Sequence, residues 1–412
     1  MNVNPNQQSI DIEYESIADC AMVSVFNKRP YMFQKKVIAH LLKMINCTIH
    51  PQAILVVQST GGGKSAIPQT TAVADGGVTI ILENTLALSA DQHSKIEQLK
   101  SDKIFAFHLD TVKSKADKES LSLRLTSLLE RDDRISVILF TSPECIVDKI
   151  WIDMIKKLVD SNFLKLVCID EVHQFVNFGL TFRKSFATLK EKLFKLLVNS
   201  NYSKDSNTSL YTVLKIPILF MTATMNQSIL GLLQQIVGIQ LFSYNIYWGD
   251  ASYFNKRNIT ICSSNTPQYL RNVKKSIAAL MTKDKRAKAI ICSNTAKKLE
   301  DMQSHFDTWL DETGIDGDSV LVVGDIEQEL KYAYTVAFTK TISDVDNQDI
   351  SKNYTPKFLF GTSGCVGAGL DLDEVRLVIR LGMPTSIINL IQEMGRCGRK
   401  KEALSSNEPN KD

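Results

Sequence analysis

The chain has 412 residues, of which 44% are hydrophobic and 23% are charged, and its formal net charge is +3. This length predicts two or three domains with a sizeable core, and the composition excludes wholesale disorder and collagen-like or coiled-coil character. The mild net charge does not by itself indicate a nucleic-acid partner. No apolar run approaches the about 18 residues of a membrane helix, so we expect no membrane association.

The cysteines and the N-terminus point to one kind of compartment. The eight cysteines are scattered and form no CxxC pair, which argues against a disulfide framework and against bound zinc. Residues 1–16 lack the basic start and apolar segment of a secretion signal. We therefore expect an intracellular protein in a reducing environment.

Short β-branched runs alternate with stretches of helical period along most of the chain. Expected helices include 86–100 and 143–159. This alternation predicts parallel sheets with helices on both faces. The expected strands are 53–57, 78–82, 103–107, 135–140, 164–170 and 216–221, followed by 258–262, 288–292, 319–323, 357–361 and 375–379.

The pattern restarts after Gly249, so we expect two successive α/β domains joined near 245–257. Surface loops are expected where apolar residues are scarce. The predicted order is a disordered N-terminus at 1–15, domains at 16–250 and 251–400, and a flexible tail at 401–412, with surface loops at 199–209 and 343–356. The segment 256–298 is locally basic, and a solvated helix face and a surface that follows phosphates remain equal alternatives for it.

A glycine-rich segment, STGGGKS at 59–65, directly follows the first expected strand. Glycines let the backbone N–H groups point at phosphate oxygens at the start of the next helix. Lys64 is expected to reach the β- and γ-phosphates, and the Ser65 hydroxyl to bind Mg²⁺. Gln58 stands where the general pattern has glycine. The predicted phosphate-binding residues are Thr60, Gly61, Gly62, Gly63, Lys64 and Ser65.

Two further motifs complete the predicted chemistry of a nucleoside-triphosphate hydrolase. DEVH at 170–173 ends a strand, where Asp170 can hold Mg²⁺ and Glu171 can polarise the attacking water. QEMGRCGR at 392–399 offers Arg396 and Arg399 as cations for the developing phosphoryl charge, contributed by the second domain. Taken alone, the acidic pair is typical of a loop start, and two arginines three apart are typical of a surface.

The ordered set of motifs resembles the superfamily 2 helicases, and among them the RecQ-like DNA helicases. In the first domain, YMFQ at 31–34 is similar to the motif that recognises adenine through glutamine, here Gln34. STGGGKS is similar to PTGGGKS, ENTLALSADQ at 83–92 occupies the place of a DNA-contact motif, TSPE at 141–144 matches outright, and DEVH stands for DEAH.

The resemblance continues through the rest of the chain. Residues 174–183 are similar to an aromatic-rich loop that stacks on single-stranded bases. MTAT at 221–224, YFNKRN at 253–258, IICSN at 290–294 and GTSGCVGAGLD at 361–371 resemble later motifs of the family, and QEMGRCGR closes the series. Gly324 and Asp325 depart from the usual "HAG", and the zinc-binding and winged-helix regions common in RecQ-like proteins are not seen.

The resemblance implies two tandem RecA-like parallel-sheet domains, the P-loop helicase core, with ATP and Mg²⁺ as cofactors and no zinc. It assigns Asp170, Glu171, Gln392, Arg396 and Arg399 to catalysis and adds Gln34, Gly369 and Asp371 to the nucleotide site. It places DNA contacts at Asn84, Thr141, Ser142, Phe175, Phe178, Phe182, Arg183, Ser293 and Thr362. Without the resemblance, the phenylalanines would be assigned to the core.

The implied activity is that of an ATP hydrolase coupled to 3′–5′ movement on single-stranded DNA and to duplex unwinding. Single-stranded and forked DNA are the implied partners, and a nuclear protein of DNA recombination and repair is the implied setting. A DNA-stimulated ATPase or translocase that does not unwind is one alternative, and a catalytically silent DNA-binding remnant is another. An RNA helicase is less favoured because of STGGGKS and the aromatic-rich loop.

Overall fold

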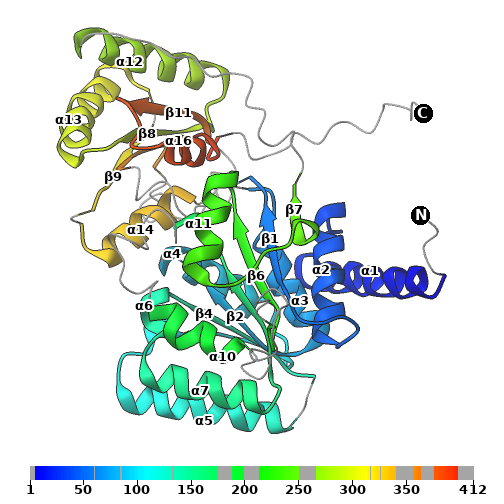
Figure 1. Cartoon of the computed structure of the whole chain (residues 1–412). Helices are drawn as coiled ribbons and strands as arrows, with labels where there is room; N and C mark the ends of the chain where they lie inside the picture. The colour runs from blue at the N-terminus through cyan, green and yellow to red at the C-terminus, as the bar shows by residue number, and fades with distance from the viewer. Residues whose placement is uncertain are drawn as a thin grey trace. The chain divides into compact units, whose positions relative to one another are not determined.

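The structure is a computed structural model, and it divides the chain into two compact units, Met1–Phe254 and Asn255–Asp412. Figure 1 shows their helices and strands. The structure describes residues 5–59, 61–83, 86–131, 134–174, 188–198, 213–249, 266–315, 317–324, 326–339, 356–362 and 375–397. No helix in these ranges is long and apolar enough to cross a membrane.

The first unit is built on a seven-stranded sheet with the order β3-β4-β2-β5-β6-β1-β7. Every recorded strand pairing in it is parallel, so the carboxyl ends of the strands lie along one edge. The expected strands of this region are confirmed, and β7 had not been predicted. The strands are β1 Ala53–Val57, β2 Gly77–Leu82, β3 Ile104–His108, β4 Ser136–Thr141, β5 Leu164–Ile169, β6 Ile218–Thr222 and β7 Ile246–Trp248.

Helices cover both faces of this sheet (Figure 1). Leu55 and Val57 of β1 face one apolar core, whereas Ile54 and Val56 face the other, because successive side chains of a strand alternate. The helical elements of the first unit are α1 Pro5–Phe26, α2 Met32–Ile45, α3 Ala66–Asp75, α4 Leu86–Glu97, η1 Leu109–Thr111, α5 Lys115–Arg131, α6 Pro143–Ile146, α7 Lys149–Asp160, η2 Lys190–Phe194, α10 Lys195–Leu197, α11 Gln227–Val237 and η4 Ser243–Asn245.

The N-terminal region differs from its prediction. Residues 5–15 belong to helix α1, so the expectation of disorder over 1–15 is wrong for them. The helix is held by tertiary contacts: Asp11 pairs with Lys43 of α2, and the Asp19 carboxylate lies 2.6 Å from the Lys35 ammonium. Met22 is buried with the residues of α2. Such packing stabilises most helices in proteins, and the local sequence does not display it.

The second unit contains a four-stranded parallel sheet with the order β11-β8-β10-β9. Phe306 packs at its centre, with ring centroids 5.1 Å from Phe358 and 5.4 Å from Phe360. Two parallel-sheet α/β domains are therefore confirmed. The strands are β8 Lys288–Ser293, β9 Ser319–Val322, β10 Phe358–Thr362 and β11 Val375–Leu381, and the helices are α12 Thr266–Lys283, α13 Ala296–Thr313, α14 Gln328–Thr339 and α16 Ile387–Met394.

Several sequence predictions fall outside the described residues. They are the strand at 258–262, the loop at 199–209, all but the last residue of the loop at 343–356, and the tail at 401–412.

Candidate nucleotide-binding site

The turn at 58–65 joins β1 to α3 and is shaped by its glycines. Gly61 and Gly63 have φ angles of 78° and 81°, in the left-handed region that favours glycine. A Cβ on Gly62 would lie 2.5 Å from Cγ of Gln58, and one on Gly63 would lie 2.5 Å from Nε2 of Gln34. The turn leads into the N-terminus of a ten-residue helix, where backbone N–H groups attract anions. This cradle fits a phosphate chain, and predicted Thr60 lies outside the described residues.

Replacing Gly63 by alanine is expected to weaken nucleotide binding at least about tenfold. The left-handed backbone alone costs an alanine about 1–2 kcal/mol, and its methyl group would also collide with the Gln34 amide. Calorimetric titration with a non-hydrolysable ATP analogue measures the affinity. Gly231→Ala in α11 is the matched control, since no atom lies within 4 Å of the added Cβ. Equal affinities of the two variants for the analogue would contradict this account of the turn.

The side chain of Lys64 lies over the same turn. Its Nζ donates to the carbonyl oxygens of Gln58 (2.8 Å) and Ser59 (3.3 Å), and the residue is only 6% exposed. The ammonium is therefore held within reach of the cradle by backbone acceptors, which a bound phosphate can replace.

Gln34 ties helix α2 to the phosphate turn. Its Oε1 accepts from the backbone N–H of Tyr31 and its Nε2 donates to the carbonyl oxygen of Gly63, both at 2.7 Å. The predicted partner of this amide was adenine, whereas the structure bonds both ends of it inside the chain. Gln34 therefore fixes the position of Gly63, a contact between residues 29 apart that the motif alone did not indicate.

The acidic pair Asp170–Glu171 directly follows β5. Burial raises the pKa of Asp170 to about 6; the neighbouring Glu171 charge adds to this effect and the Lys64 ammonium opposes it. The structure thus brings the turn at the end of β1 and the acids at the end of β5 close enough for their charges to interact. Glu171 has φ of +50°, which is uncommon for a residue other than glycine. Residues in such a backbone conformation are found most often at functional sites.

His173 connects the acidic pair to the end of β6. Its Nδ1 lies 2.9 Å from Oγ1 of Thr222 and 3.3 Å from Oε2 of Glu171. The Thr222 hydroxyl also donates to the carbonyl oxygen of Thr224 (3.0 Å) and accepts from its N–H (3.1 Å). The DEVH and MTAT motifs therefore form one buried hydrogen-bonded network.

Ser65 and Asp170 offer the hydroxyl and carboxylate oxygens that Mg²⁺ prefers. Within the part of the chain that the structure describes, no group of three or more His, Cys, Asp or Glu residues gathers to hold a metal. Mg²⁺ in nucleotide sites uses one or two protein carboxylates together with phosphate and water, so this sparse donor set fits that ion.

Two of the DNA-contact residues predicted in the first unit, Thr141 and Ser142, are described by the structure, and their surroundings differ. Thr141 is fully buried, and Ser142 caps the N-terminus of helix α6, where its hydroxyl accepts from the Cys145 N–H (3.1 Å). Asp110 accepts from both the N–H (2.8 Å) and the hydroxyl of Ser142, a pairing across 32 residues that no motif indicated. Predicted Asn84, Phe175, Phe178, Phe182 and Arg183 lie outside the described residues.

In the second unit, predicted residues gather at two places. Ser293 and Thr362 are register partners at the ends of β8 and β10, so these two predicted DNA contacts lie side by side. Gln392 is 6% exposed and Arg396 is completely buried at the end of α16. Gly369, Asp371 and Arg399 lie outside the described residues.

Comparison with known proteins agrees with this arrangement. Residues 31–231 match the DEAD/DEAH box helicase family, and residues 271–401 match the helicase conserved C-terminal domain. The "ATP-dependent DNA helicase Q1" of Rattus norvegicus is 22% identical over 360 residues, 87% of this chain and 50% of that protein. The "ATP-dependent DNA helicase RecQ" of Haemophilus influenzae is 22% identical over 357 residues, 87% of this chain and 48% of that protein.

Solved structures show the same fold at low sequence identity. A structure of Mss116p bound to ssRNA and AMP-PNP has a TM-score of 0.58 and 14% identity, over 93% of this chain and 70% of that one. S. cerevisiae Dbp5 bound to RNA and ADP BeF3 has a TM-score of 0.57 and 14% identity, over 93% and 84%. At this sequence identity, both structures are similar to this chain in fold alone.

The chain spans about half the length of the curated relatives it matches. Both helicase domains are matched in order, and the relatives named as DNA helicases align over most of the chain. The chain therefore contains the two domains of a DEAD/DEAH box helicase core, and over most of its length it is similar to RecQ-like DNA helicases.

Proposed function

We propose that this chain is an ATP-driven motor that moves 3′ to 5′ along single-stranded DNA and unwinds duplex DNA. The observation that carries the proposal is that Lys64, after β1, lies close enough to Asp170, after β5, for their charges to interact. Hydrolysis needs both a cation that binds phosphate and a carboxylate that binds the metal. Similarity to relatives named as DNA helicases supports DNA as the polymer.

In this proposal the first unit binds and activates the nucleotide. The glycine cradle and Lys64 hold the β- and γ-phosphates, with Thr60 and Gln34 assigned to the same site. Ser65 and Asp170 would hold Mg²⁺, which when bound neutralises charge on the phosphates. The Glu171 carboxylate accepts the proton of the attacking water, and His173, 3.3 Å away, orients that carboxylate.

The remaining assignments of the proposal rest on the family pattern. Gln392, Arg396 and Arg399 are assigned to the phosphoryl-transfer reaction, and Gly369 and Asp371 to nucleotide binding. DNA contacts are assigned to Ser293 and Thr362, and to Asn84, Thr141, Ser142, Phe175, Phe178, Phe182 and Arg183. Roles in recombination and repair in the nucleus are part of the same proposal.

Single-stranded DNA is expected to stimulate ATP hydrolysis by the whole chain, and a forked duplex is expected to be separated when ATP and Mg²⁺ are present. Phosphate release and strand separation are measured in the same samples, with RNA of the same sequence in a parallel arm. Stimulation without strand separation would identify a translocase and reject the unwinding step. The proposal of a DNA motor would be rejected if added DNA left the rate of ATP hydrolysis unchanged, or if only RNA increased that rate.

A further inference from the structure

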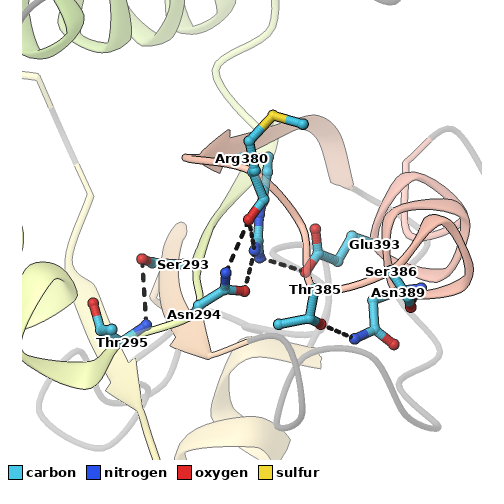
Figure 2. Close-up of polar contacts among 9 residues, drawn as sticks. Ser293, Asn294, Thr295, Arg380, Thr385, Ser386, Asn389 and Glu393 are labelled. Atoms are coloured by element: carbon cyan, nitrogen blue, oxygen red, sulfur yellow. Dashed lines mark hydrogen bonds and ion pairs between the residues drawn. The ribbon is translucent and has the colours of Figure 1, made fainter. Parts of the chain in front are cut away.

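The guanidinium group of Arg380 joins three segments of the second unit, as Figure 2 shows. Arg380 lies near the end of β11. Its Nη1 donates to Oε1 of Glu393 on α16 (2.7 Å). Its Nη2 donates to Oδ1 of Asn294, directly after β8, and to the carbonyl oxygen of Met383 (3.1 Å). Asn294 belongs to the motif IICSN and Glu393 to the motif QEMGRCGR, but no role was predicted for either residue or for Arg380.

Asn294 and Arg380 also share an acceptor. The Asn294 Nδ2 donates to the same Met383 carbonyl oxygen, at 2.9 Å. The turn after β8 and the segment between β11 and α16 are therefore fastened to each other at one point. Since the planar guanidinium donates in a fixed fork, it can hold Asn294 and Glu393 at once, which a lysine ammonium cannot reproduce.

The Glu393 end of this network is deeply buried. The Glu393 side chain is 1% exposed and that of Arg380 is 10% exposed, so their ion pair lies in a low-dielectric setting where charge-assisted bonds are strong. Burial and the Glu393 charge raise the pKa of the nearby Cys292 thiol, while Arg380 and Arg396 oppose this rise. The Glu393 carboxylate and two arginines thus share one buried region around Cys292.

Each end of the network lies next to residues with a proposed role. Asn294 follows Ser293, whose hydroxyl accepts from the N–H of Thr295 (3.5 Å), so the turn 293–295 carries a proposed DNA contact. Glu393 follows Gln392, and its carbonyl oxygen accepts from the N–H of Arg396 (3.1 Å). The position of Glu393 therefore constrains the backbone that carries Arg396.

We propose that Arg380 is a positioning residue that couples the turn 293–295 to the Gln392–Arg396 end of α16, and thereby makes ATP hydrolysis respond to bound DNA. This inference rests on the proposed function. A strand that displaces the turn shifts the Asn294 amide, and Arg380 passes the shift to Glu393.

The test measures ATP turnover against single-stranded DNA concentration for the whole chain and for Arg380→Lys, Asn294→Ala and the double variant. Each single variant is expected to lower the ratio of DNA-stimulated to basal turnover about fivefold or more, the size of a typical coupling. The KM for ATP is expected to stay within about twofold, since the change acts on turnover and not on nucleotide binding. The double variant is expected to be no worse than the more affected single variant, because both remove one shared contact.

Arg376→Lys is the matched control, because Arg376 is an exposed arginine on the same strand and its variant is expected to keep the parent ratio. Asn294→Ala removes only a neutral amide, so it carries the test if Arg380→Lys unfolds at lower urea than the parent. If the parent responds to DNA and both single variants keep its ratio, the coupling is wrong and the proposed function stands. If single-stranded DNA does not increase ATP turnover by the parent, the proposed function fails and this inference fails with it.

Discussion

Replacing Lys64 by alanine is expected to lower the turnover number for ATP by about 10²–10³-fold, the usual loss when one positioned charge is removed from a reacting centre. The Nζ is fixed by the carbonyl oxygens of Gln58 and Ser59, and the residue is only 6% exposed. In such a site a cation acts on phosphate charge with little screening. Phosphate release at saturating ATP, with and without single-stranded DNA, measures the effect.

Lys35→Ala is the control for this experiment. Lys35 directly follows Gln34 in helix α2, but its ammonium pairs with Asp19 at 2.6 Å and not with the phosphate turn. Pairs of this partly exposed kind contribute little to stability, so near-parental turnover is expected. If Lys64→Ala hydrolyses ATP as fast as Lys35→Ala does, the glycine-rich turn is not the site of phosphoryl transfer.

The parts of the fold that were predicted are those encoded by local patterns. The strand expected at 53–57 is confirmed as β1. The strand expected at 164–170 is confirmed as β5, ending one residue earlier. Both are short buried runs rich in valine, leucine and isoleucine, a signal that needs no knowledge of distant residues. The glycine-rich turn and the acidic pair were recognisable for the same reason, because each lies directly after such a strand.

The contacts that were not predicted join residues far apart in the sequence. Asn294 and Arg380 are separated by 86 residues, and Ser142 and Asp110 by 32. A hydrogen bond between such residues depends on the order of strands in the sheet, and the hydrophobic pattern does not determine that order. Helix α1 was missed on similar grounds, since its ion pairs with Lys35 and Lys43 exist only after α1 packs on α2.

Replacing Glu171 by glutamine is expected to lower the turnover number by about 10²–10⁴-fold, the usual contribution of a general base. The glutamine has the same shape, so it can keep the left-handed backbone at φ +50° and the neighbourhood of His173, but it cannot take a proton from water. Nucleotide affinity and DNA affinity are therefore expected to remain. Single-turnover hydrolysis, together with titration of an ATP analogue, separates the chemical step from binding.

The matched control is Glu97→Gln. Glu97 also faces a histidine, with its Oε2 3.6 Å from Nδ1 of His93, but its side chain is 61% exposed on helix α4. A carboxylate in that position is solvated, so the exchange is expected to leave turnover unchanged. The two variants thus remove the same charge beside the same kind of ring, but Glu171 is buried and directly follows Asp170, whereas Glu97 is exposed. If Glu171→Gln retains parental turnover, the base is another group, and the left-handed backbone at Glu171 serves the packing of the DEVH segment.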